Sequence, residues 1–90
     1  MQLRIEGFIW LAWVIDKLDA KHGVDPDEVE ETFFNPPYKV RRTAADKYLL
    51  YGRTADGRYL FIVFVWRGNH VKVISAREMT PSEKRYYGRR

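Results

Sequence analysis

The sequence contains no cysteine, only two histidines and no long apolar segment. The lack of cysteine excludes disulfide bonds and thiolate metal sites, and His22 and His70 lie too far apart for a zinc-ligand spacing. The longest early apolar run, Phe8 to Ile15, is too short to span a bilayer, and it continues into Asp16 without a small-residue cleavage site. We therefore predict a cytoplasmic protein with no structural metal, no cofactor, no signal peptide and no membrane segment.

The chain has 90 residues, of which 46% are hydrophobic and 31% are charged. This length lies near the lower end for self-sufficient domains, so we predict one domain that spans residues 1–90. A chain this short depends on large side chains to fill its core, and it has three Trp, six Tyr and five Phe.

Charge is unevenly divided along the chain. Residues 1–34 hold three Lys or Arg against eight Asp or Glu, whereas residues 35–90 hold thirteen against four. A basic region that also contains several tyrosines suits RNA, because cations neutralise phosphates and aromatic rings stack on unpaired bases. An acidic protein partner fits the charge equally well, and so does a simple solvating role for Lys and Arg.

The N-terminal third predicts a strand followed by a helix. Apolar and charged residues alternate from Leu3 to Gly7, and the following residues are apolar up to Trp10. Apolar residues then recur at helical spacing, and Gly23 is a typical helix stop. We expect this helix to cover Ala12–His22.

Residues typical of the first turn of a helix predict two further helices. Asp25 fits an N-cap, a proline follows it, and Glu28 completes a capping box. This helix ends before Asn35-Pro36-Pro37, because proline interrupts helical hydrogen bonding. Thr80 and Glu83 repeat the capping pattern around Pro81, which predicts a short basic helix at the C-terminus.

Between these helices the apolar period changes to two, which is typical of strands. We predict strands over Tyr38–Thr43, Lys47–Thr54, Arg58–Trp66 and His70–Ala76. The first suits a sheet edge because prolines precede it and it carries two arginines. The third is apolar on both faces, so we expect it to be central and covered on both sides.

The resulting order is β-α-α-β-β-β-β-α, with short connections that require mainly antiparallel strands. We therefore predict an α+β fold, in which two N-terminal helices and a short C-terminal helix pack against one sheet.

No phosphate-binding loop, metal box or nucleophile elbow is recognisable. Cleavage of RNA by its own 2′-hydroxyl requires only proton transfer and a cation beside the phosphate, and arginine matches phosphate geometry well. The residues most suited to this chemistry are Arg77 and Glu78, where the last strand meets the last helix. Arg53 and Arg67 could approach them from neighbouring strands. The alternative role for Arg77 is a surface ion pair with Glu78 or with the capping residue Glu83.

Short blocks spread over nearly the whole chain match one known family. They include Lys21-His22-Gly23-Val24, Tyr51-Gly52-Arg53, Val73-Ile74-Ser75-Ala76-Arg77, Met79-Thr80, and Glu83 with Tyr86-Tyr87. Through them the chain resembles the BrnT family of type II toxins, whose fold is related to RelE- and ParE-type toxins. The resemblance implies a ribonuclease that inhibits translation and is neutralised by a ribbon-helix-helix antitoxin. Operator DNA would then be bound only through the antitoxin.

The resemblance also guides the choice of site residues. We assign catalytic roles to Arg77, Arg53, Glu78 and Arg67, and RNA contacts to Tyr51, Tyr87, Lys84 and Arg85. Two alternatives stay open. The chain could be a non-catalytic module that docks a partner helix, or an RNA-binding domain without toxicity.

Overall fold

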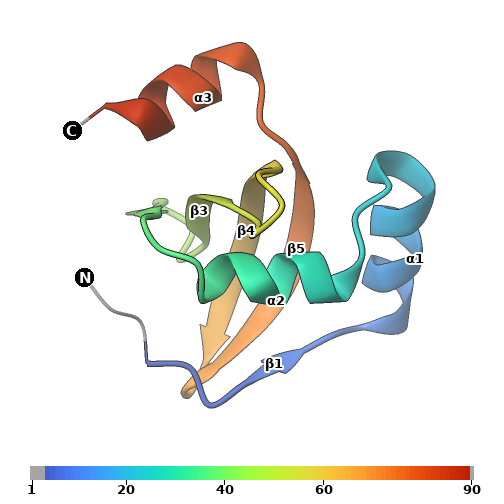
Figure 1. Ribbon diagram of the computed structural model, residues 1–90. Coiled ribbons are helices and arrows are strands. Elements are labelled where there is room, and N and C mark those ends of the chain that lie inside the picture. Colours follow the sequence, from blue (N-terminus) through green and yellow to red (C-terminus); the bar gives the residue numbers. More distant parts are fainter. Residues whose placement is uncertain (1–3, 90) are drawn as a thin grey trace.

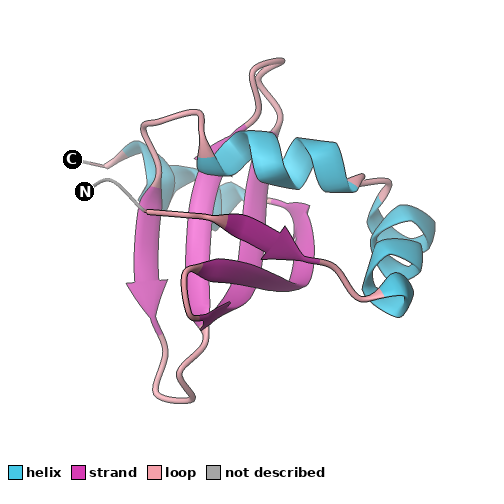
Figure 2. Ribbon diagram, turned by 90° about the horizontal axis from the view of Figure 1, so that it is seen from below, coloured by secondary structure: helices cyan, strands magenta, loops and turns pink. Residues whose placement is uncertain are grey.

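The computed structural model describes residues 4–89, which form one five-stranded sheet with three helices (Figures 1 and 2). The elements are β1 (Gly7–Ile9), α1 (Ala12–His22), α2 (Pro26–Phe33), β2 (Lys39–Arg42), β3 (Tyr48–Arg53), β4 (Tyr59–Arg67), β5 (His70–Glu78) and α3 (Pro81–Gly88). Their order and the α+β class confirm the prediction from sequence.

The strands lie in the order β1-β5-β4-β3-β2, so β4 is central and β2 is an edge strand, as predicted. Strands β2 to β5 are antiparallel to their neighbours, and β1 runs parallel to β5. The first strand is shorter than expected, because β1 begins only at Gly7 and pairs with three residues of β5. Leu3, where we expected this strand to start, lies outside the described residues.

The predicted helix ends agree closely with the structure. Helix α1 ends at His22 and is capped by Gly23, whose φ of 59° is left-handed. Both capping boxes are present: the backbone N–H of Glu28 donates to Asp25 over 3.1 Å, and that of Glu83 donates to Thr80 over 3.3 Å. None of the helices in the described part of the chain is long and apolar enough to cross a membrane.

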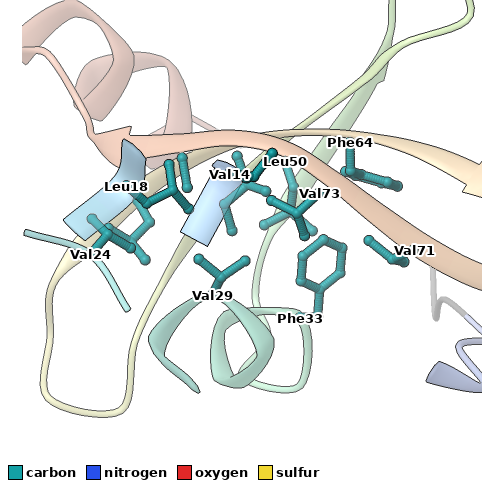
Figure 3. Close-up of a cluster of buried hydrophobic side chains, with 12 residues drawn as sticks. Val14, Leu18, Val24, Val29, Phe33, Leu50, Phe64, Val71 and Val73 are labelled. Atoms are coloured by element: carbon teal, nitrogen blue, oxygen red, sulfur yellow. The ribbon is translucent and has the colours of Figure 1, made fainter. Parts of the chain in front are cut away.

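Helices α1 and α2 cover one face of the sheet, which we call the core face (Figure 1). Figure 3 shows the apolar side chains buried between them, from α1, α2 and the strands. Fully buried members include Val14, Leu18, Val24, Val29, Leu50, Ile62, Phe64, Val71 and Val73. In the aromatic part of this core, the Phe33 and Phe64 rings meet edge to face at 5.1 Å.

The opposite face, which we call the second face, is covered only at one end. There Tyr86 of α3 packs on Tyr51 of β3, with ring centroids 4.7 Å apart. Along β4, Leu60, Ile62 and Phe64 on the core face are fully buried, but Val63 and Val65 on the second face are only half-buried. The prediction that β4 is covered on both sides is therefore wrong for this part of the strand, because α3 is too short to extend over it.

A β-bulge in β5 decides which side chains reach each face. Val63 pairs with Ser75, but the next residue of β4 pairs with Val73, so Ile74 is the extra residue. Before the bulge, odd-numbered residues such as Val73 face the core; after it, even-numbered residues such as Ala76 do so. The bulge thereby turns Arg77 onto the second face.

Candidate functional site

The second face of the sheet is strongly basic. Strand alternation and register place six cations on it: Lys39, Arg41, Arg53, Arg67, Lys72 and Arg77. None of the described strand residues on this face is Asp or Glu. The charge imbalance seen in the sequence is therefore concentrated on one surface of the fold.

Arg77 forms a two-pronged ion pair on this face. Its two terminal nitrogens donate to the two carboxylate oxygens of Glu83 over 2.7 and 2.8 Å, and its guanidinium lies 4.5 Å from the centre of the Phe61 ring. These hydrogen bonds hold the pKa of the Glu83 carboxyl below its ordinary value of 4.5 and raise the pKa of Arg77. Both side chains are partly buried, with 35% and 18% of their surfaces exposed.

Glu83 therefore has two roles. It completes the capping box of α3 by accepting the backbone N–H of Thr80 over 2.8 Å, and it also holds Arg77. From the sequence, the cap was the favoured role for Glu83, and the ion pair with Glu83 was the alternative role for Arg77; the structure shows both. The bidentate pair requires the bulge as well, because only the bulge puts Arg77 on the face that carries α3.

A second group of cations lies around Tyr59, close to α3. The guanidinium of Arg53 and the ammonium of Lys84 lie 5.7 and 5.2 Å from the centre of the Tyr59 ring. The Tyr87 ring contacts the same tyrosine edge to face at 6.0 Å. The structure thus brings together Arg53, Lys84 and Tyr87, three of the residues selected from the sequence.

A pocket of about 440 Å³ adjoins this group; its lining consists of Pro37, Tyr38, Lys39, Arg53, Tyr87, Gly88 and Arg89. The lining contains three cations, two aromatic rings and no carboxylate. The Tyr87 hydroxyl donates to the carbonyl oxygen of Pro37 over 2.6 Å, and burial raises the pKa of this hydroxyl above its ordinary value of 10.0. A pocket of this lining suits an aromatic ring that carries a negatively charged group.

Four other residues selected from the sequence are placed differently. Tyr51 is only 6% exposed, so its ring has no free face on which a base could stack. Arg85 is exposed on α3. Arg67 lies at the far end of β4, six residues beyond Phe61 (the partner of Arg77), a separation of roughly 20 Å along a strand. The structure therefore does not place Arg67 near Arg77 and Glu83.

Glu78 faces the other side of the sheet. It pairs in register with Leu60 of the core face, and its carboxylate accepts a hydrogen bond from Arg58 over 2.8 Å. Arg58 also donates to Glu28 and to the carbonyl oxygens of His22 and Gly23. Glu78 thus belongs to a structural network at the junction of α1, α2 and β5.

Two cations of β2 were not selected from the sequence. The ammonium of Lys39 donates to the carbonyl oxygen of Tyr86 over 2.6 Å and lies 4.5 Å from the centre of its ring. Arg41 lies 5.3 Å from the same ring. Their spacing of two residues on an edge strand was a usable signal, because it places both side chains on one face.

Comparisons with known proteins agree with this geometry. Residues 15–83 match the family described as "Ribonuclease toxin, BrnT, of type II toxin-antitoxin system". The fold is similar to the crystal structure of the Brucella abortus ribonuclease toxin BrnT, with a TM-score of 0.69 and 26% sequence identity, over 82% of this chain and 96% of that one. A search among curated proteins found no significant match.

The fold and its basic face thus define a ribonuclease-toxin type of scaffold. The family match extends over more than half of the chain, so this protein belongs to the BrnT family of type II toxins. Membership implies an antitoxin partner and an RNA substrate. The matched region includes Arg53, Arg77 and Glu83, and it ends before Tyr87.

Proposed function

We propose that this protein is a metal-independent endoribonuclease whose site is centred on Arg77. The observation that carries the proposal is the Arg77–Glu83 pair, which places a cation and a carboxylate side by side on a face to which the described strands contribute no acidic side chain. RNA cleavage by the 2′-hydroxyl requires these two groups, one for the phosphate and one for the proton. Within residues 4–89, no group of three or more His, Cys, Asp or Glu is arranged to hold a metal ion.

The pair also suggests how the reaction starts. A phosphate of the RNA replaces Glu83 on the guanidinium of Arg77 and removes the interaction that lowers the Glu83 pKa. The freed carboxylate then takes the proton of the 2′-hydroxyl, whose oxygen attacks the phosphorus. The bond from phosphorus to the 5′ oxygen breaks, this oxygen takes a proton from solvent, and a 2′,3′-cyclic phosphate remains.

The neighbouring residues bind the substrate in this proposal. Arg53 and Lys84 lie around Tyr59 and neutralise the phosphates that flank the cleaved bond. Tyr87 presents part of its ring to the pocket beside Arg53, where an RNA base can stack. Arg85 extends the basic surface of α3. Three residues selected from the sequence lie outside the reacting centre in this proposal. Tyr51 is buried, Glu78 points to the core face, and Arg67 lies too far along β4.

We further propose that cleavage of RNA inhibits translation in the cytoplasm. The antitoxin implied by the family is, in this proposal, a ribbon-helix-helix protein that neutralises the toxin and carries it to operator DNA. The toxin itself then contacts DNA only through that partner.

One observation favours a second function, that of a non-catalytic RNA- or partner-binding module. Both terminal nitrogens of Arg77 are engaged by Glu83, and the same carboxylate also caps α3. If this pair does not open, the basic face binds an anionic partner and cleaves nothing.

The test is induced expression in a host that lacks the antitoxin, with growth and total RNA integrity as readouts. We expect the wild type to stop growth and degrade RNA, and Arg77→Ala to lower the cleavage rate by about a hundredfold or more. Arg42→Ala is the matched control, because Arg42 forms an exposed ion pair with Asp46 away from this face. Arg77→Lys keeps the charge but not the two-pronged geometry, so it should restore little activity.

Purified protein then separates the two functions. Cleavage of a synthetic RNA in EDTA, leaving cyclic phosphate ends, supports the metal-independent enzyme. Intact RNA that is nevertheless bound by the wild type supports the binding module. Full activity of Arg77→Ala would remove Arg77 from the mechanism.

A further inference from the structure

The part of the second face beyond α3 is an uncovered apolar strip. It consists of Leu49 on β3 with Val63 and Val65 on β4; Leu49 and Val63 are a directly opposed cross-strand pair. All three are half-buried, although in the described residues no helix lies over them. The sequence of β4 is apolar on both faces, a pattern typical of strands that are covered on both sides. Within residues 4–89 no helix or strand provides such a cover on this part of the second face.

Cations surround the strip. Arg41 is the partner of Leu49 across β2 and β3, Lys72 is the partner of Val65 across β4 and β5, and Arg67 follows two residues after Val65. Within residues 4–89 none of the three forms an ion pair. An occupant of this surface therefore needs apolar side chains in its centre and acidic ones at its margins.

The surface also limits the secondary structure that its occupant can have. The strands under it are already hydrogen-bonded to their neighbours, so the face offers no backbone partners to an added strand. A helix satisfies its own backbone and can lay an apolar stripe on such a face. The distance from β2 to β5 covers three strand spacings, about 14 Å, which corresponds to about ten helical residues.

A hollow of about 510 Å³ adjoins one end of the strip. Val65 and Arg67 line it from the second face, whereas Arg42, Tyr48 and Trp66 line it from the core side of the sheet. The hollow therefore lies around the ends of these strands and marks where the strip stops.

We propose that this surface, formed by Leu49, Val63 and Val65 with Arg41, Arg67 and Lys72, binds an acidic amphipathic helix of the antitoxin. The inference deepens the proposed function, because it assigns a place to the partner that the family implies. RNA is the less suitable occupant, since three aliphatic side chains offer its bases neither stacking rings nor hydrogen bonds.

The position of the strip gives the helix a way to block cleavage. Val63 lies two residues from Phe61, the residue paired with Arg77, a distance of about 7 Å along β4. A helix with a diameter of about 10 Å centred over Val63 extends about 5 Å towards Phe61, so it lies directly beside the Arg77 guanidinium and narrows the approach to it. Antitoxin and RNA are therefore expected to exclude each other.

The test measures, by titration calorimetry, the affinity for the antitoxin that the family implies. The Arg77→Ala chain serves as the background, so the result does not depend on whether the wild type cleaves RNA. We expect Arg67→Glu with Lys72→Glu to weaken binding at least tenfold. The matched control is Arg4→Glu with Lys21→Glu, which makes the same change in net charge at exposed positions that are not part of this surface and should leave the affinity within about twofold.

Val63→Thr tests the apolar part with almost no change in shape, and we expect a loss of affinity of about fivefold. Unchanged affinity in both the charge-reversed and the Val63 variant would overturn the proposal, and so would an equal loss in the control. A selective loss of binding to a single-stranded RNA oligonucleotide, with antitoxin binding intact, would assign the surface to RNA instead. A dimer of the free chain that Val63→Thr dissociates would assign it to a second copy.

Discussion

Replacement of Arg58 by alanine is the strongest stability test of this fold. Arg58 follows the β3–β4 turn, and its guanidinium donates to the carboxylates of Glu28 and Glu78 and to the carbonyl oxygens of His22 and Gly23. One side chain thus joins the end of α1, the start of α2 and the end of β5. Alanine removes all of these bonds at once.

The expected magnitude follows from burial. The Arg58 side chain is 25% exposed, and the carboxylate of Glu28 is 30% exposed, so this pair and the two carbonyl bonds each contribute about 1 kcal/mol. The Glu78 side chain is 63% exposed, and its pair adds about 0.5 kcal/mol or less. We therefore expect Arg58→Ala to lower the free energy of unfolding by about 3 kcal/mol, a large part of the stability of a small domain.

Urea denaturation followed by circular dichroism measures this loss, and Arg42→Ala is the matched control. Arg42 also pairs with a carboxylate, that of Asp46, but both side chains are mostly exposed, at 65% and 78%. We expect that substitution to leave the free energy of unfolding almost unchanged. If the two variants lose the same stability, or if Arg58→Ala loses less than about 1 kcal/mol, burial does not control these pairs and the reasoning fails.

Two further predictions concern other contacts. Because the pKa of Glu83 is lowered in the folded state, its ionised carboxylate stabilises the fold above pH 4.5, and this contribution is lost as the pH falls through the folded pKa. The stability difference between wild type and Glu83→Gln, measured by urea denaturation at pH 7, 5 and 3, should therefore shrink on acidification. A difference that grows on acidification would contradict the prediction. A Cβ at Gly52 would lie 2.6 Å from Cγ2 of buried Thr32, so Gly52→Ala should cost about 1 to 3 kcal/mol. Gly88→Ala is its control in the same thermal melts, because a Cβ there meets nothing within 4 Å, and equal melting temperatures would refute the prediction.

Local patterns in the sequence were sufficient to predict most of the fold. The caps at Asp25 and Thr80 and the left-handed stop at Gly23 depend only on residues close in the chain, so the helix ends could be predicted from sequence. The strands after residue 38 could likewise be predicted from period-two patterns. Contacts between residues far apart in the sequence could not be predicted in this way. The parallel pairing of β1 with β5 joins segments more than sixty residues apart, and no local pattern encodes it.

The candidate site shows the same division. Arg53, Arg77, Lys84 and Tyr87 were selected from sequence, and the structure places them on one face around α3. Glu78 was grouped with Arg77 because the two are adjacent in sequence. Adjacent residues of a strand point to opposite faces, so only one of them could face α3, and the sequence did not show which.

The bulge at Ile74 determines that Arg77, and not Glu78, lies on the face of α3. It therefore affects both the apolar core and the candidate site. In a regular ladder Arg77 would share the face of Val71 and Val73, which are fully buried, and its charge would then point towards the apolar core. The extra residue reverses the alternation, so small Ala76 fills the core position and Arg77 reaches Glu83 and the Phe61 ring. The basic face and the apolar core thus depend on one irregularity in β5, and the residues that flank it carry structural and functional constraints together.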